Sequence, residues 1–159
     1  MMKLSEMMNN LKFRIPVEDY ILVDYELFFN DELGKYNRFS IDDKEGIQDI
    51  KKAINEILNT DINAKVYICS YSYETTDYKG ERNIYTDCIW LDTSIDIISV
   101  RQLFDSFTSV QPSSVTLLKE MDEYYQPHFY LFMNNGDIID LREDISGNNF
   151  DNVIVLYWD

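Results

Sequence analysis

Apolar residues recur at helical spacing in three stretches of the chain. Residues 4–11 place leucine or methionine at i, i+3, i+4 and i+7, which predicts a short helix. Residues 42–59 carry an isoleucine-rich stripe that starts after an Asp-Asp pair able to cap a helix. Residues 96–107 carry a similar stripe after Ser94 or Asp96, which are both good caps. We expect each stripe to pack inward, so the pattern predicts two or three helices.

The other apolar runs are rich in β-branched and aromatic residues, which favour strands. Residues 19–29 form one such run, and residues 34–41 are predicted to pair with it as a hairpin after an Asn-Asp-Glu-Leu turn. A second hairpin is predicted from residues 64–76 and 82–94, around a polar tip at 77–81. These four runs indicate a sheet with mainly antiparallel pairing.

Three further stretches complete the predicted sheet. Residues 115–118 form a short apolar strand, and residues 152–158 form a closing strand. Residues 128–141 read as a hairpin that turns on Asn135-Gly136, a dipeptide well suited to a type I′ turn. With the runs above, this brings the predicted sheet to about six or seven strands.

Length and composition suit one folded domain. The 159 residues are 45% apolar and 14% aromatic, which is enough to form a core. The chain contains no repeat and no proline-rich linker. We therefore predict a single α+β domain over residues 1–159, with two or three helices packed against the sheet.

The sequence also points to a cellular compartment. No apolar run approaches the roughly 20 residues of a membrane helix, and the opening residues lack the apolar core and cleavage site of a secretory signal. We therefore expect a cytoplasmic protein with no membrane partner. Cys69 and Cys88 fall on consecutive predicted strands, and this compartment favours a reduced, buried pair over a disulfide or a redox pair.

Net charge is the strongest global feature. The chain has 14 basic and 29 acidic residues, a formal net charge of −15. Residues 1–60 carry a net −4 and residues 61–159 a net −11, and the last forty residues hold nine acids against Arg142 alone. Nucleic-acid binding requires a basic face, so this balance argues against a nucleic-acid partner and favours a cationic protein.

Catalytic and metal-binding patterns are weak. His128 is the single histidine, follows a proline, and has no Gly-flanked serine nucleophile to activate. Asp140, Glu143 and Asp144 lie at i, i+3 and i+4 but lack the EF-hand pattern, and no glycine-rich phosphate loop occurs. We therefore expect no enzymatic activity, no cofactor and no metal.

Two acidic stretches remain as candidates for partner binding. One is "EMDEYY" at residues 120–125, and the other is "DIIDLREDISGNNFDN" at residues 137–152. A solvated acidic face is the simplest interpretation, but −15 exceeds the magnitude of about 2–8 that solubility requires of a small domain. We predict that the following residues bind the partner: Glu120, Asp122, Glu123, Tyr124, Tyr125, Asp137, Asp140, Glu143, Asp144 and Asp151.

In size, composition and these two acidic stretches, the chain resembles the small immunity proteins of bacterial contact-dependent inhibition and polymorphic toxin systems. The resemblance implies an inhibitor that neutralises one cognate basic toxin domain, such as a nuclease. Two alternatives stay open. One is a nucleic-acid mimic of the anti-restriction or anti-CRISPR type, and the other is an enzyme that uses paired carboxylates.

Overall fold

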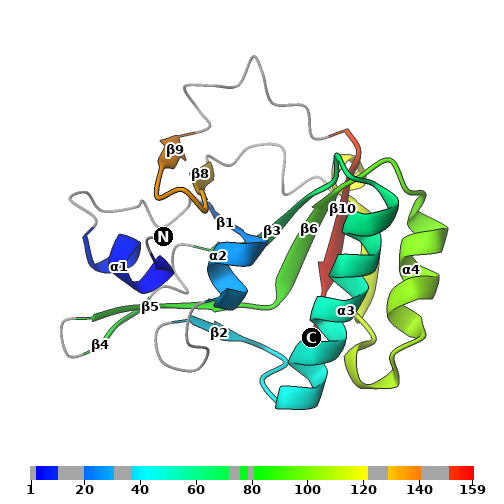
Figure 1. Ribbon diagram of the computed structural model, residues 1–159, viewed down its shortest axis with the longest axis horizontal. Coiled ribbons are helices and arrows are strands. Elements are labelled where there is room, and N and C mark those ends of the chain that lie inside the picture. Colours follow the sequence, from blue (N-terminus) through cyan, green and yellow to red (C-terminus); the bar gives the residue numbers. More distant parts are fainter. Residues whose placement is uncertain are drawn as a thin grey trace. The chain divides into compact units, whose positions relative to one another are not determined.

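The computed structural model describes residues 3–10, 20–30, 37–71, 76–78, 81–121, 129–140 and 151–159 (Figure 1). The chain forms two compact units, and each unit is built from three separate segments. The first unit comprises Met1–Phe39, Tyr67–Thr86 and Gln126–Asn148, and the second comprises Ser40–Val66, Asp87–Tyr125 and Asn149–Asp159. Because the segments alternate along the chain, no single cut separates the units, and the single domain stays a prediction.

The first unit combines two short α-helices with several short strands. Its elements are α1 (Leu4–Asn9), β1 (Tyr20–Asp24), α2 (Tyr25–Asn30), β2 (Asn37–Phe39), β4 (Thr76–Tyr78), β5 (Glu81–Thr86), β8 (Phe129–Phe132) and β9 (Ile138–Asp140). Strand β3 (Lys65–Tyr71) begins in the second unit and continues in the first.

The second unit combines two longer helices with three antiparallel strands. Its elements are α3 (Lys44–Thr60), β6 (Cys88–Asp92), α4 (Ile97–Asp105), the 3-10 helices η2 (Thr108–Val110) and η3 (Leu118–Glu120), β7 (Ser114–Leu117) and β10 (Val153–Tyr157). Strand β10 pairs antiparallel with both β6 and β7, and α3 packs beside α4 (Figure 1).

The predicted α+β class is confirmed. Seven strands form a sheet in the order β7-β10-β6-β3-β1-β8-β9, and β2, β5 and β4 form a smaller sheet. Most pairs are antiparallel, while β1 runs parallel to β8 and β2 runs parallel to β5. The described residues contain four α-helices, one more than the largest predicted number, because α2 was not predicted.

Helix α3 follows its sequence pattern closely. Of the two candidate caps it uses Asp43, whose side chain accepts a hydrogen bond from the backbone N–H of Gly46 at 2.9 Å. The face with Ile47, Ile50, Ala53, Ile54 and Ile57 is buried, as the stripe predicts. The predicted third helix is also confirmed, as α4.

Helix α4 is capped at its start and packs near its end against Trp158, the residue that follows β10. Asp96 caps α4 by accepting the backbone N–H of Ser99 at 2.9 Å. The ring of Phe104 meets Trp158 edge-on, with centroids 6.0 Å apart, and the indole N–H of Trp158 donates to the carbonyl of Val110 at 3.1 Å. The buried tryptophan therefore keeps its polar group satisfied.

The predicted strand over residues 19–29 is wrong in its second half. The strand ends at Asp24, whose carboxylate accepts the backbone N–H of Glu26 at 3.0 Å, and α2 begins at Tyr25. Leu27, Phe28 and Phe29 are buried in α2. A short apolar run is compatible with either a strand or a buried helix. Here the helix is the form in which these side chains are buried.

The predicted partner of that strand, residues 34–41, is also placed differently. Residues 37–39 of this stretch form β2, which pairs in parallel with β5 and not with β1. The rings of Phe28 and Phe29 lie 6.5 Å and 6.0 Å from the ring of Phe39 on β2. Aromatic packing between α2 and β2 thus replaces the predicted hairpin.

The predicted hairpin of residues 64–76 and 82–94 is divided into more strands than expected. Its second arm breaks at Asp87, so that β5 joins the small sheet and β6 joins the large one. Its tip is confirmed in a shorter form, because β4 pairs with β5 from Thr76↔Asn83 to Tyr78↔Glu81. Strand β3 lies between β6, from the predicted second arm, and β1, with which it pairs antiparallel.

The predicted hairpin over residues 128–141 is confirmed, but its turn differs. The N–H of Gly136 donates to the carbonyl of Met133 at 3.0 Å, and the N–H of Met133 donates to the carbonyl of Asp137 at 2.8 Å. Asn134 and Asn135 are therefore the central turn residues, and Gly136 follows with φ 95°. This is a three-residue hairpin loop with a left-handed glycine, and not the two-residue type I′ turn.

Candidate functional site

The structure describes four of the ten predicted partner-binding residues, and they divide between the two units. Asp137 and Asp140 belong to the first unit, at the turn and end of the β8–β9 hairpin, whereas Glu120 and Asp151 belong to the second. Glu120, Asp137 and Asp151 are exposed, and Asp140 is half-buried. The other six predicted residues, Asp122, Glu123, Tyr124, Tyr125, Glu143 and Asp144, lie outside the described residues, as does His128.

Asp137 has a structural role in its hairpin. Its carboxylate accepts a hydrogen bond from the side-chain amide of Asn135 at 3.0 Å, and its backbone N–H donates to the side-chain oxygen of Asn135 at 3.0 Å. Next to it, the amide of Asn134 donates to the carboxylate of Glu26 at 2.9 Å. The beginning of the acidic stretch is thus held by polar turn contacts, while its charge stays at the surface.

The two cysteines are buried and are not joined by a disulfide bond. Among the described residues, no group of three or more His, Cys, Asp or Glu side chains could hold a metal ion. No helix in the described ranges is long and apolar enough to cross a membrane.

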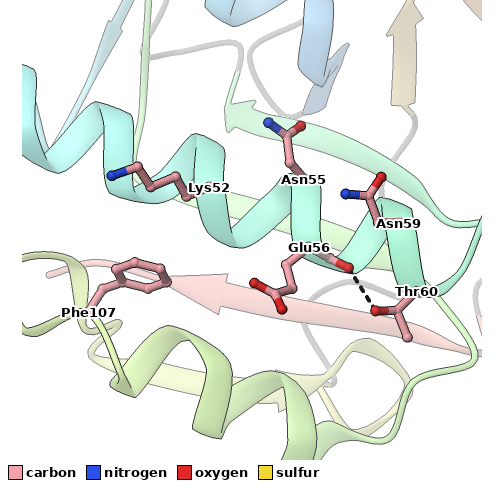
Figure 2. A pocket seen from close by; sticks show the side chains of 6 residues that line it. All are labelled: Lys52, Asn55, Glu56, Asn59, Thr60 and Phe107. Atoms are coloured by element: carbon pink, nitrogen blue, oxygen red, sulfur yellow. Dashed lines mark hydrogen bonds between the residues drawn. The ribbon is translucent and has the colours of Figure 1, made fainter.

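A groove in the second unit offers a concave polar surface. It has a volume of about 520 Å³ and opens between α3 and the segment that follows α4 (Figure 2). Its lining residues are Lys52, Asn55, Glu56, Asn59, Thr60 and Phe107. Five of the six come from the exposed face of α3, opposite to its buried isoleucine stripe.

The groove combines several kinds of recognition group. In Figure 2 the carboxylate of Glu56 points from α3 toward the α4 side, and the ring of Phe107 forms the wall on that side. The hydroxyl of Thr60 donates to the backbone carbonyl of Glu56 at 2.9 Å, so the Glu56 carboxylate is not used in that bond. A groove that is lined by a carboxylate and an aromatic ring suits a lysine or arginine side chain.

One end of the α3–α4 pair carries two large apolar side chains in water. Ile62, just after α3, is 85% exposed, and Ile98, in the first turn of α4, is 67% exposed. They are the two most exposed large hydrophobic residues in the described part of the chain. Sequence reasoning did not select them, although Ile98 falls outside the buried stripe of Val100 and Phe104, which is the signal that could have indicated it.

The carboxylate of Asp61 holds the two segments that carry these isoleucines. It accepts hydrogen bonds from the hydroxyl of Thr93 at 2.8 Å and from the backbone N–H and hydroxyl of Ser94 at 3.0 Å and 3.2 Å. Its other oxygen accepts the backbone N–H of Asn63 at 3.1 Å. Ile62 follows Asp61 directly and Ile98 lies four residues after Ser94, so both sit on a hydrogen-bonded corner. We call Asp61, Ile62, Thr93, Ser94 and Ile98 the α3–α4 corner.

The corner is electrostatically negative. The backbone N–H of Ser94, followed by the Thr93 hydroxyl, lowers the pKa of Asp61 below its ordinary value, so this carboxylate is ionised at neutral pH. The backbone N–H and hydroxyl of Ser99 likewise lower the pKa of Asp96. Burial raises the pKa of neighbouring Asp92. The positive charge of Lys65 lowers this pKa, and the negative charge of Asp61 raises it, each by less than burial does. By sequence, the segments of the second unit hold six basic and fifteen acidic residues, a net charge of −9.

No known protein family, curated protein or solved structure matches this chain at a significant level.

Proposed function

We propose that this chain is an immunity-type inhibitor, a cytoplasmic protein that binds and neutralises a basic toxin domain, such as a nuclease. The observation that carries the proposal is the net charge of −15, of which the second unit holds −9. The proposed activity is protein binding, with no chemical step carried out by the chain itself.

The size of the net charge supports this proposal, because so large a charge lowers the stability of the folded chain. Self-repulsion at −15 opposes compaction, and solubility is served by a magnitude of about 2–8. A functional benefit would offset this loss of stability if the negative field attracts a cationic protein. Complementary electrostatic potentials speed the encounter of two proteins and discriminate against wrong partners. Nuclease domains are basic where they hold phosphates, so they offer the complementary surface.

Tight binding also requires contacts that are not charged. Interfaces gain most of their affinity from a few apolar or aromatic anchors that become fully desolvated. Tyr124 and Tyr125 are the anchors predicted from the sequence, and the exposed Ile62 and Ile98 supply further apolar area. Charge steers the partner, and such residues hold it.

An affinity purification tests the proposal. The tagged full chain is expressed in its source organism, and co-purifying proteins are identified by mass spectrometry. We expect one stoichiometric basic protein, and we expect the purified chain to abolish that protein's toxicity and its nuclease activity. A partner of acidic or neutral isoelectric point, or a chain that leaves the toxicity intact, would contradict the proposal.

Two variants refine the test. Replacing Asp140, Glu143 and Asp144 together with Ala is expected to abolish protection, since these acids belong to the predicted binding segment. Replacing the exposed residues Asp42, Glu45 and Asp105 with Ala is the matched control, because it removes the same charge elsewhere. If both variants protect as fully as the wild-type chain, binding lies outside residues 137–152. If the recovered partner is a DNA-binding protein without toxicity, and duplex DNA displaces the chain from it, the nucleic-acid mimic is favoured instead.

A further inference from the structure

Ile62 and Ile98 differ from ordinary exposed hydrophobic residues in their setting. Single apolar side chains on a surface are common and need no explanation. Here two of them lie on segments joined by the hydrogen bonds of one carboxylate, that of Asp61. The C-terminal end of α3 and the N-terminal end of α4 lie at the same end of the helix pair (Figure 1). The two side chains are therefore presented by a fixed backbone.

A fixed backbone lowers the cost of binding. An interface on a mobile loop loses conformational entropy when the loop becomes ordered, whereas a corner that is already ordered does not. The α3–α4 corner is held at Asp61 by four hydrogen bonds and at Asp96 by the α4 cap. Ile62 and Ile98 thus have the preorganisation expected of anchors.

Charge identifies the kind of partner. Asp61 and Asp96 flank the two isoleucines in sequence, and Asp92 lies near Asp61 and Lys65. A second copy of the chain would bring one −9 unit against another, which like-charge repulsion disfavours. A basic protein meets the same acids with opposite charge. We propose that Ile62 and Ile98 are the apolar anchors through which the α3–α4 corner docks a basic protein partner, with Asp61 and Asp96 as its acidic rim.

The nearby groove extends this surface along α3. Glu56 lies six residues before Ile62, on the exposed side of α3, and it lines the groove together with Phe107 (Figure 2). A carboxylate and an aromatic ring in one groove are groups that recognise a lysine or arginine side chain of a partner. The corner supplies apolar contacts and the groove supplies a specific charged one.

The inference rests on the proposed function, and its test uses the basic protein recovered by the wild-type chain. The variants are Ile62→Asp and Ile98→Asp, each alone and together. Both add negative charge, so purely electrostatic binding would become tighter and loss of an apolar anchor would make it weaker. Ile98→Asp lies in the first turn of α4, where an acid is compatible with the helix dipole, so folding should be retained.

Gln48→Asp is the matched control, since it adds the same charge at an exposed position of α3 far from its C-terminal end. We expect each isoleucine variant to weaken binding by about 30-fold, mainly through faster dissociation. The control should bind within about twofold of the wild-type chain, as surface changes usually have small effects. Circular dichroism is the measurement that checks whether each variant is folded.

The outcomes separate the two proposals. If the double variant binds the basic partner as tightly as the wild-type chain, the corner is not the docking surface, while the inhibitor function stands. If the wild-type chain recovers no basic partner, the inhibitor function and this inference both fail. If sedimentation shows a wild-type dimer that the double variant converts to monomer, the corner binds a second copy and the inference is overturned.

Discussion

The carboxylate of Asp61 accepts a hydrogen bond from the backbone N–H of Ser94 at 3.0 Å, across 33 residues of sequence. The same carboxylate accepts the hydroxyl of Thr93 at 2.8 Å. This contact joins the end of α3 to the loop that leads into α4, and it connects a stability determinant to the proposed docking surface.

Replacing Asp61 with Ala should destabilise the second unit and loosen the α3–α4 corner. The variant leaves the N–H of Ser94 and the hydroxyl of Thr93 without their acceptor. We expect a lower thermal unfolding midpoint and faster amide hydrogen exchange at Ser94. The control is Asp105→Ala, which removes the same charge from an exposed ion pair. In that pair Nε of Arg101 lies 3.6 Å from Oδ2 of Asp105, and its loss should leave both measurements nearly unchanged.

The Asp61 contribution should also depend on pH. Hydrogen bonds from Ser94 and Thr93 hold its pKa below the ordinary value of 3.8, so its stabilising effect is present above about pH 3.8. It is lost as the pH falls through the lowered pKa. The difference in midpoint between Asp61→Ala and the wild-type chain should therefore shrink at strongly acidic pH, and an unchanged difference would contradict this account.

Replacing Gly46 with Ala should destabilise α3, although helix propensity alone predicts a gain of about 1 kcal/mol. A Cβ atom at Gly46 would lie 2.5 Å from Cγ2 of Ile41 and 2.8 Å from Oδ1 of Asp43, the capping side chain. Relieving these contacts disturbs the cap, and we expect a loss of about 1–3 kcal/mol in urea unfolding. Gln48→Ala, at an exposed position of the same helix, should be neutral or slightly stabilising.

Replacing Asp24 with Asn should stabilise the chain at neutral pH. Burial raises the pKa of Asp24 above 3.8. The hydrogen bond from the backbone N–H of Glu26 lowers this pKa, and the negative charge of the Glu26 side chain raises it, but both effects are smaller than that of burial. The neutral form contributes stability that is present below pH 3.8 and is lost as the pH rises through the raised pKa. Asn imitates that neutral form and keeps an acceptor for the N–H of Glu26.

The Asp24→Asn variant should therefore unfold at a higher temperature at pH 7 and match the wild-type chain below pH 3.8. Asp61→Asn is the control of opposite sign, since the pKa of Asp61 is lowered. It should lower the midpoint at pH 7. Two variants that shift the midpoint in the same direction would contradict the assigned pKa directions.

Salt should slow the association of the chain with its proposed basic partner. Raising the ionic strength from about 0.01 to 0.15 M shortens the Debye length from roughly 30 to 8 Å, which removes most long-range steering. We expect the association rate to fall by at least about tenfold and the dissociation rate to change much less. Stopped-flow measurements test this, and a salt-independent association rate would mean that the acids only solubilise the chain.

Much of the helical structure was predictable because its signals are local. The stripe of α3 and the acids at its start follow from the spacing of a few neighbouring residues, and Asp96 and the stripe of α4 behave in the same way. Strand β10 was predictable too, since Val153–Leu156 form a continuous β-branched and aliphatic run. Net charge is a sum over the sequence, so the expected class of partner needed no coordinates.

The tertiary structure decided the elements and surfaces that depend on distant residues. Residues 25–29 have an apolar pattern compatible with a strand, and their burial as a helix against Phe39 on β2 requires a contact that local periodicity does not encode. The exposure of Ile62 and Ile98 was equally hidden, because an isoleucine is accessible only if no other segment covers it. The hydrogen bonds from Thr93 and Ser94 to Asp61 likewise join residues far apart in sequence. The sequence alone therefore determined the net charge, and the tertiary structure decided which isoleucines are exposed.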